Sequence, residues 1–240
     1  MQAWFDGICY NINDNDATVT YWYQYSGSII IPETVTLDGI TYPVTAIDDR
    51  AFTGRALTSI TIPNSVTTIG AGAFSWCRHL TSVTIPNSVT TISDYAFMGC
   101  SALTEVVIGR SVSSIGFGSF DYCNALISVK CYAVEPPSIE DDTFYESYNS
   151  ATLFVPAISL DSYSTHQYWG LFQNIQAIEQ TPGDVDGDGK VGIADVTDLI
   201  DLLLDGSLDI LSHPEADVDG DGKIGIADVT ELIDMLLASY

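Results

Sequence analysis

Aspartate residues recur at a fixed spacing in two nearly identical segments that begin at Asp184 and Asp217. The segments read DVDGDGKVGIADVTDLIDLLL and DVDGDGKIGIADVTELIDMLL, and 18 of their 21 positions are identical. Each has Asp at loop positions 1, 3 and 5, Gly at position 6, an apolar residue at position 8 and Asp at position 12. This is the spacing of a calcium-binding loop, so the sequence predicts two bound calcium ions.

The coordination chemistry of calcium explains the pattern. Calcium takes about six to eight oxygen ligands, and alternate aspartates converge on one ion only where a glycine allows a sharp bend. Gly189 and Gly222 stand at that bend, and Val191 and Ile224 are expected to anchor the loops in a core. The predicted ligands are Asp184, Asp186, Asp188, the Lys190 carbonyl and Asp195 in the first loop, and Asp217, Asp219, Asp221, the Lys223 carbonyl and Asp228 in the second.

A helix is predicted after each loop, over Ala194 to Leu204 and Ala227 to Leu237. Apolar residues fall on two stripes at helical spacing. The first is the core stripe, and the second is either a wide extension of the core, because small domains need all their apolar surface, or a contact surface. The core stripe comprises Val196, Leu199, Leu203 and Val229, Leu232, Leu236; the second comprises Ile193, Thr197, Ile200, Leu204 and Ile226, Thr230, Ile233, Leu237.

The duplicated loop-and-helix unit is similar to type I dockerin modules. Position 12 is Asp where a helix–loop–helix calcium sensor has Glu, and ThrProGly precedes the first loop where a sensor has a helix. The resemblance implies a cohesin-like partner bound in the presence of calcium. Dockerins often carry a hydroxyl pair at loop positions 10 and 11, and the Ile-Ala pair here suggests an apolar contact. The implied partner-binding residues are Ile193, Ala194, Ile200, Asp201 and Asp205, with Ile226, Ala227, Ile233 and Asp234.

The earlier part of the chain contains a 23-residue repeat. IPNSVTTIGAGAFSWCRHLTSVT from Ile62 is followed by IPNSVTTISDYAFMGCSALTEVV from Ile85, and Phe74, Phe97 and Phe120 keep the same step. Each unit holds a short strand and a second extended piece, and it is too small to bury its own apolar face. Neighbouring units must therefore stack into a solenoid with one continuous core.

The repeat resembles the BspA-like leucine-rich repeats of exported bacterial surface proteins. The resemblance implies a mainly β fold, a leucine-rich-repeat solenoid with β-rich caps, followed by a small all-α calcium-loop domain. It also favours a secreted or cell-surface location, with any signal peptide already removed. The expected boundaries are an N-terminal β cap over 1–43, repeats over 44–130, a C-terminal cap over 131–179, a linker over 180–183 and the dockerin-like module over 184–240.

Side-chain alternation along the repeat strands predicts one exposed sheet face, a candidate surface for an unknown macromolecule. The cysteines Cys77, Cys100 and Cys123 keep the 23-residue step, so we expect small buried side chains at equivalent corners. The predicted exposed residues are Ser59, Thr61, Ser82, Thr84, Glu105, Val107, Ser128 and Lys130.

Charge and composition exclude several classes of function. Seven Lys and Arg stand against 32 Asp and Glu, a net charge of -25, which leaves no basic patch for nucleic acid or anionic lipid. No apolar run is long enough to span a membrane. His79, His166 and His213 form no motif with the cysteines, so no catalytic residues are predicted and we expect no enzyme.

We therefore expect an exported, non-catalytic binding or adhesion protein. In this interpretation the solenoid binds a protein or glycan, and the C-terminal module docks to a cohesin. Two alternatives stay open: the calcium-loop pair is only a calcium-stapled structural cap, or the chain is an accessory of a polysaccharide-degrading complex, where an enzymatic role for 1–180 would require a pocket with converging carboxylates.

Overall fold

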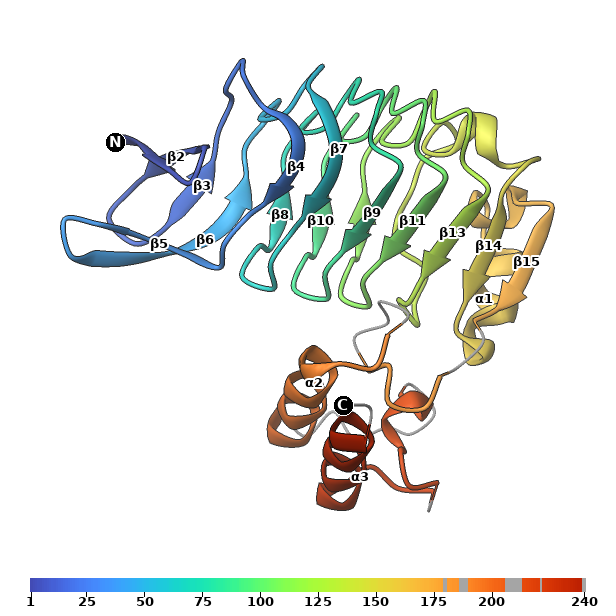
Figure 1. Cartoon of the computed structure of the whole chain (residues 1–240). Coiled ribbons are helices and arrows are strands. Elements are labelled where there is room, and N and C mark those ends of the chain that lie inside the picture. Colours follow the sequence, from blue (N-terminus) through green and yellow to red (C-terminus); the bar gives the residue numbers. More distant parts are fainter. Residues whose placement is uncertain (179–180, 186–189, 206–212, 221, 239–240) are drawn as a thin grey trace. The chain divides into compact units, whose positions relative to one another are not determined.

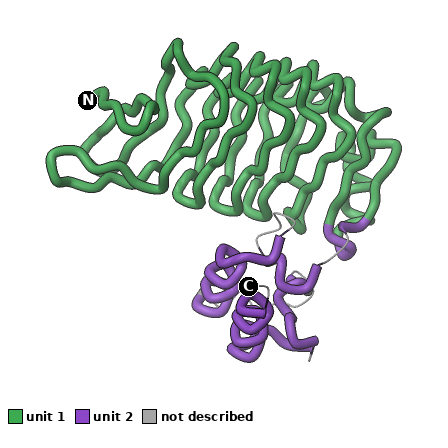
Figure 2. Tube along the Cα trace, in the orientation of Figure 1, with its two compact units in different colours: residues 1–155, 159–176 green, residues 156–158, 177–240 purple. Residues whose placement is uncertain are grey.

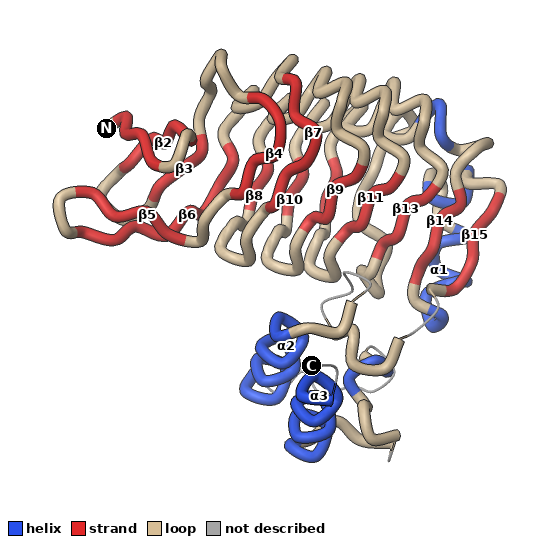
Figure 3. The backbone as a smooth tube through the Cα atoms, viewed as in Figure 1, coloured by secondary structure: helices blue, strands red, loops and turns tan. Residues whose placement is uncertain are grey.

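The computed structural model describes residues 1–178, 181–185, 190–205, 213–220 and 222–238. The chain divides into two compact units (Figure 2). Unit 1 comprises residues 1–155 and 159–176, and unit 2 comprises residues 156–158 and 177–240. The fold is mainly β, and the two longest helices lie in unit 2 (Figure 3). No helix in the described part of the chain is long and apolar enough to cross a bilayer.

Unit 1 begins with antiparallel strands that cover the first end of the solenoid. Two hairpins turn at Asp-Gly pairs, Asp6-Gly7 and Asp38-Gly39, and all four residues have positive φ. Because a two-residue turn of this kind matches the twist of the flanking strands, it fixes the register, with Phe5 opposite Ile8. The strands are β1 (Gln2–Phe5), β2 (Ile8–Ile12), β3 (Ala17–Val19), β5 (Thr34–Leu37) and β6 (Ile40–Ile47), and a parallel pairing of β3 with β6 joins the two antiparallel groups.

The repeats that follow form a solenoid in which the turns contribute strands to two sides (Figure 1). On one side, short strands extend the sheet in parallel from β6, in the order β8 (Thr68–Ile69), β10 (Thr91–Ile92) and β12 (Ser114–Ile115), and each pairs with the strand before it. On the other side β4 (Ser26–Ile30) pairs with β7 (Ala56–Thr61), and a five-stranded sheet is formed by β9 (Ser82–Ile85), β11 (Glu105–Ile108), β13 (Ser128–Cys131), β14 (Thr152–Val155) and β15 (Asn174–Ala177).

The predicted repeat ladder is present in the core. Phe52, Phe74, Phe97, Phe120 and Phe144 are fully buried and stack face to face, with successive ring centroids 4.8–5.2 Å apart. Each ring fills the space that the neighbouring turn leaves, so the core is continuous along the solenoid.

Buried aromatic residues close both ends of this stack. Tyr25 packs against the first phenylalanine, and Trp169 against the last, with centroids 4.7 and 5.4 Å apart. The Trp169 indole N–H donates to the Pro137 carbonyl at 2.8 Å, so its polar atom is satisfied in the core. This end also contains the helix α1 (Leu160–Thr165) and the 3-10 turns η1 (Tyr145–Ser147) and η3 (Trp169–Leu171), and the 3-10 turn η2 (Ala157–Ser159) is divided between unit 2 and unit 1.

The sheet face of β7, β9, β11 and β13 was predicted to be exposed, and one residue was predicted wrongly. Ser59, Thr61, Ser82 and Thr84 are exposed, and Glu105, Ser128 and Lys130 are half-buried. Val107 is buried, with 7% of its surface accessible. Lys130 lies beside it in register on β13, and the Lys130 Nζ reaches the Glu105 carboxylate on β11 at 3.1 Å.

Unit 2 consists of two helices and the segments that precede them. The helices are α2 (Ile193–Asp205) and α3 (Ile226–Ala238), each one residue longer at both ends than predicted, and η4 (Pro214–Ala216) precedes the second loop. Their core stripes share one hydrophobic cluster, in which Leu199 and Leu232 are fully buried. Ile224 is also buried and Val191 half-buried, as expected of residues that anchor the loops.

Candidate calcium loops and partner-binding surfaces

The second loop gathers three carboxylates around one point. Oxygen atoms of Asp217, Asp219 and Asp228 all lie within 4.8 Å of one another. Oxygens that share a calcium ion at about 2.3–2.6 Å can be no further apart than about 5 Å, so this spacing fits one ion. Among the described residues this is the single group of three potential metal ligands at such distances.

Asp228 holds the loop in this shape from the first turn of α3. Its Oδ1 accepts the N–H groups of Val218 and Asp219 at 2.8 and 3.2 Å, and its Oδ2 accepts that of Gly225 at 2.6 Å. Asp228 is 1% accessible as a residue, so burial and three donors orient its carboxylate toward the start of the loop. A shorter Asp at position 12 can thus serve as a ligand and a loop brace together.

Asp217 carries a buried oxygen that the protein does not satisfy. Its Oδ2 accepts the N–H of Gly222 at 3.0 Å, whereas its Oδ1 is buried without a hydrogen-bond partner among the described residues. An unpaired buried carboxylate oxygen is unfavourable, and a bound cation would satisfy it. Gly222 adopts φ +85, the left-handed bend that the sequence required at loop position 6. The residues present therefore fit a calcium ion.

The first loop shows the same bracing at the residues that are described. Asp184 and Asp195 are buried, and Asp195 Oδ2 accepts the N–H of Gly192 at 2.6 Å, the equivalent of the Asp228–Gly225 bond. The side chains of Lys190 and Lys223 are exposed. The predicted ligands Asp186, Asp188 and Asp221, and the predicted bend at Gly189, lie outside the described residues.

The second apolar stripe of both helices is exposed in the structure. Ile193 and Ile226 are 77% and 80% accessible, and Leu204 and Leu237 are also largely accessible. The remaining members, Thr197, Ile200, Thr230 and Ile233, are exposed as well, so this stripe is no part of the unit 2 core. The predicted partner-binding residues Ala194, Asp201, Ala227 and Asp234 are exposed beside it, and the side chain of Asp205 is not described.

Sequence reasoning missed exposed aromatic side chains in two columns of corner positions of the solenoid, Trp76 and Tyr122 in one column and Tyr95 in the other. Trp76, Tyr95 and Tyr122 all have left-handed backbone angles, with φ 57–60. Glycine stands at the equivalent position one turn away in each case, so a 23-residue alternation of aromatic and Gly was available as a signal. The Trp76 ring lies over Gly99 and stacks with Tyr122 at a centroid distance of 6.2 Å.

The three histidines do not come together. His79 is exposed in a repeat corner, His213 lies 3.5 Å from a Glu215 oxygen in unit 2, and His166 Nδ1 accepts the backbone N–H groups of Tyr168 and Trp169. All five cysteines are buried free thiols.

Comparison with known families identifies both parts of the chain. The BspA type Leucine rich repeat region matches residues 45–175 in six copies, and the Dockerin type I domain matches residues 182–237. Both are non-catalytic domain types, and a dockerin generally binds calcium and a cohesin. Comparison with curated proteins gives no match.

Solved structures of bacterial leucine-rich repeat proteins resemble the solenoid. One from Bacteroides capillosus is 33% identical, with a TM-score of 0.50, over 54% of this chain and 97% of that chain. A leucine rich cell surface protein from Faecalibacterium prausnitzii is 30% identical, with a TM-score of 0.53, over 67% of this chain and 44% of that chain. The T. pallidum leucine rich repeat protein, 19% identical over 81% of this chain and 92% of that chain, shares the fold with a TM-score of 0.56. The chain belongs to the BspA-like leucine-rich-repeat proteins and carries a C-terminal type I dockerin module.

Proposed function

We propose that this chain is an exported, non-catalytic binding protein that docks through residues 184–240 to a cohesin-like partner. The observation that carries the proposal is the exposed apolar stripe of α2 and α3. Ile193 and Ile226 are 77% and 80% accessible although the unit 2 core is small. A contiguous exposed apolar surface of this kind favours an interaction site.

Calcium connects the loops to this surface. Ile193 and Ile226 begin the helices directly after the two loops, and Asp195 and Asp228 in the first helical turns hold the loop backbone. We infer two ions, one for each loop, that position the helix starts and with them the partner surface. In this proposal, residues 1–179 form the solenoid with its caps, and residues 180–183 link it to the dockerin-like module.

The solenoid is proposed as the second binding element, for a protein or a glycan at the surface of a cell. The exposed face of Ser59, Thr61, Ser82 and Thr84 supports this part of the proposal, since solenoids use extended sheet faces for binding. Export and surface location are supported by the family of the repeats.

A capture experiment tests the docking proposal. Immobilised cohesin domains of several classes are expected to retain the full chain in calcium and to release it in EDTA. A matched variant with Ile193→Glu, Ala194→Glu, Ile226→Glu and Ala227→Glu is expected to fold and to be lost from the cohesin. Failure of every cohesin to retain the folded, calcium-loaded chain would favour the structural-cap alternative instead.

The same quadruple variant serves as the control for the solenoid. Because its docking surface is removed, any retention on surface glycans or extracellular matrix proteins then reports on unit 1. Protease accessibility of the chain on intact cells tests the proposed surface location.

A further inference from the structure

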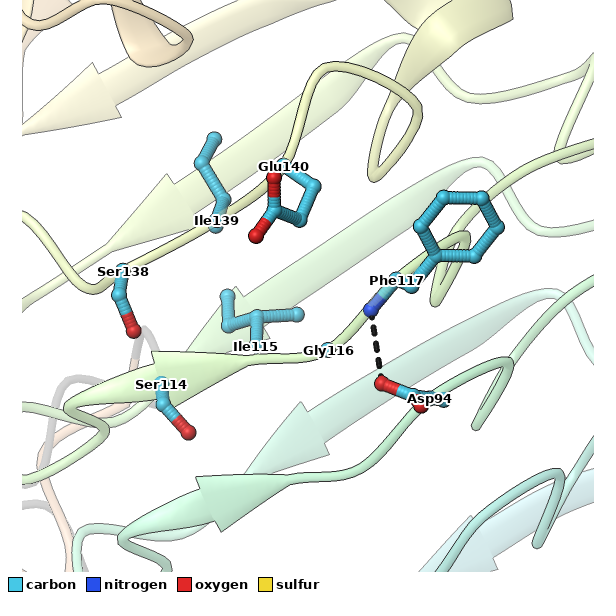
Figure 4. A pocket seen from close by; sticks show the side chains of 8 residues that line it. All are labelled: Asp94, Ser114, Ile115, Gly116, Phe117, Ser138, Ile139 and Glu140. Atoms are coloured by element: carbon cyan, nitrogen blue, oxygen red, sulfur yellow. Dashed lines mark hydrogen bonds between the residues drawn. The ribbon is translucent and has the colours of Figure 1, made fainter.

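An open pocket of about 270 Å³ lies where β12 runs into the next corner of the solenoid (Figure 4). Ile115 and Ile139 are buried and form its apolar floor, side by side because Ser114 and Ser138 form a parallel bridge. Three successive turns of the solenoid line the pocket, and all of them belong to unit 1. The site is separate from the sheet face of β7 to β13 and from the calcium loops.

Two carboxylates flank the pocket from different turns. Asp94 and Glu140 lie on opposite sides of the Gly116–Phe117 backbone (Figure 4). The Phe117 N–H donates to Asp94 Oδ1 at 3.0 Å, which fixes this carboxylate on one side. A Cβ on Gly116 would collide with Asp94 Oδ1, so glycine is needed for the carboxylate to approach the chain this closely.

An aromatic edge completes the pocket and is held in place. The Phe117 ring is exposed and meets Tyr95 edge to face, with centroids 5.5 Å apart at 77°. Tyr95 has φ 59, and its ring atoms come within 3.1 Å of the position that a Cβ on Gly118 would occupy. The same left-handed angle recurs at the equivalent residues Arg50, Gly72 and Gly118, so it is a property of the repeat corner, and this corner holds the Tyr95 ring beside Phe117.

The charge of the lining selects the ligand. The lining contains two carboxylates and the hydroxyls of Ser114 and Ser138, and no Lys, Arg or His. Burial, together with the negative charges of Asp141 and Asp94, raises the pKa of the neighbouring Asp142, so negative potential is concentrated here. A neutral ligand would cover the carboxylates without compensating their charge, and an anion would be repelled.

A divalent metal does not fit this lining. Calcium needs about six oxygens close to one point, and the side chains of the lining offer two carboxylates and two hydroxyls, which come from three different turns. A long basic side chain fits better, because its methylene stem can lie on an apolar floor while its charged end reaches carboxylates. The Phe117 ring can add a cation–π contact.

We propose that this pocket binds a lysine or arginine side chain of a partner protein, with the charged group between Asp94 and Glu140 and the stem over Ile115 and Ile139. The inference deepens the proposed function, because it rests on the solenoid being a binding element and gives the chemistry of one of its ligands.

The test uses the full, calcium-loaded chain and a peptide pair that differs in one charge. The probe is acetyl-Gly-Lys-Gly-amide, and the control probe is the same peptide acetylated on the lysine Nζ. NMR titration follows the backbone amides of Gly116 and Phe117. The charged peptide, and its arginine analogue, are expected to shift these amides, with an effect that weakens as salt is added, and the acetylated peptide is expected to leave them unchanged.

Charge-removing variants locate the binding. Asp94→Asn, whose amide oxygen can still accept the Phe117 N–H, and Glu140→Gln are each expected to weaken the charged peptide about two- to fivefold. Asp38→Asn changes the net charge equally at the distant β5–β6 turn and is expected to have no effect. Equal binding of the acetylated peptide, equal loss in Asp38→Asn, or a shift produced by methyl glucoside and not by lysine would each overturn the proposal.

Failure of this inference is distinguishable from failure of the proposed function. If the Asp94→Asn, Glu140→Gln double variant still captures macromolecules through unit 1 and still docks to a cohesin, the proposed function stands and the pocket assignment is wrong.

Discussion

The Cys100 thiol donates to the backbone carbonyl of Phe74, one turn earlier in the solenoid, with Sγ and O 3.2 Å apart. Cys77 and Cys123 make the equivalent bonds to the carbonyls of Phe52 and Phe97, at 3.1 and 3.3 Å. The cysteine column is therefore joined, turn by turn, to the backbone that carries the stacked phenylalanine rings. A free cysteine here is a structural donor that also fills a small buried space.

These thiols should react only when the solenoid unfolds. Burial raises the pKa of Cys77 and Cys123 to about 12 and that of Cys100 well above its ordinary value. Because the thiolate is the nucleophile, iodoacetamide at pH 8 is expected to label the three cysteines in denaturant and not in the native chain, as measured by mass spectrometry.

The raised pKa values of these thiols also predict that the folded solenoid loses stability at alkaline pH. The unfolded thiol ionises near pH 9 and the folded one near pH 12, so the stabilisation is complete below about pH 9 and is lost as the pH rises toward 12. Native labelling as fast as labelling of the unfolded chain would contradict both expectations.

Gly99 should tolerate a methyl group less well than its equivalent Gly54. Both are left-handed, with φ 73 and 68, but a Cβ on Gly99 would lie 2.5 Å from Cε3 of Trp76, whereas one on Gly54 meets nothing within 4 Å. Gly54→Ala is expected to lower the free energy of unfolding by about 1–2 kcal/mol, the left-handed penalty alone. Gly99→Ala is expected to cost about 1–3 kcal/mol more, because the methyl group overpacks the indole.

Denaturant unfolding of a double variant separates the two causes. In a Trp76→Ala background the excess cost of Gly99→Ala over Gly54→Ala should disappear, since the ring that the methyl group meets is gone. An excess that persists without the indole would show that the backbone angle, and not Trp76, sets the cost.

Asp121 and Glu146 should make the solenoid less stable at neutral than at mildly acidic pH. Both carboxylates accept the Tyr122 N–H, at 3.1 and 2.9 Å, and burial, followed by the hydrogen bond and charge of Glu146, raises the pKa of Asp121 to about 6. The pKa of an unfolded aspartate is about 3.9, so the stabilisation is complete below pH 4 and is lost as the pH rises through 6.

Melting temperatures of Asp121→Asn and the parent chain measure this effect. As the pH rises from 4.5 to 7.5, the melting temperature of the variant is expected to rise relative to that of the parent, because the amide cannot acquire the charge that repels Glu146. Asp14 is an exposed carboxylate in the β2–β3 turn, and Asp14→Asn should have the same melting temperature as the parent at every pH. A parent-minus-variant difference that is constant with pH would rule out the shared-proton explanation.

The repeat period made most of the solenoid predictable. Phe74, Phe97 and Phe120 could be assigned to one core column because stacking turns must place equivalent residues over one another. Val107 was missed because alternation along one strand assigns a side chain to a face and does not say how far the neighbouring strands, with Thr84 and Lys130 in register beside it, leave it exposed. The Asp94–Glu140 pocket was missed for the same reason, since its walls come from turns 46 residues apart in the sequence.

Three carboxylates of the second candidate calcium loop were predictable from their spacing, whereas the bracing of the loop was not. Ligand spacing identified Asp217, Asp219 and Asp228, which the fold brings together. That Asp228 also accepts N–H groups of the loop follows from the short Asp side chain at the helix start, which reaches the loop backbone. The exposure of Ile193 and Ile226 could not be deduced from helical periodicity, which assigns a stripe to one side and does not say whether another element covers it.

Removing calcium should unfold unit 2 before it affects unit 1. Binding free energy at a site absent from the unfolded chain appears as folding free energy, so EDTA is expected to lower the melting temperature of a transition followed by α2 and α3 and to leave that of the β solenoid unchanged. Calorimetric titration of the chelated chain should give two calcium equivalents. One equivalent should be lost in Asp184→Ala and one in Asp217→Ala, and neither in Glu231→Gln on the exposed side of α3. A melting profile that EDTA leaves unchanged would refute the metal assignment.

Either half of unit 2 should be able to carry the partner surface. The two segments share 18 of 21 residues, and Ile193 and Ile226, which begin the helices, have nearly the same exposure, 77% and 80%. A partner that recognises one copy therefore meets an equivalent surface on the other. Ile193→Glu with Ala194→Glu is expected to weaken binding of the cohesin-like partner only about twofold, since one of two equivalent orientations is lost.

Adding Ile226→Glu and Ala227→Glu to that variant should abolish binding, because every orientation then buries unpaired carboxylates in an apolar contact. The matched control, Thr61→Glu with Thr84→Glu on the exposed sheet of unit 1, adds two charges elsewhere and should bind like the parent in a calorimetric titration with calcium present. Complete loss in the Ile193, Ala194 variant alone would mean that the partner uses one face in one orientation. Normal binding by the quadruple variant would move the interface away from α2 and α3 altogether, and the exposed apolar stripe would then need another occupant.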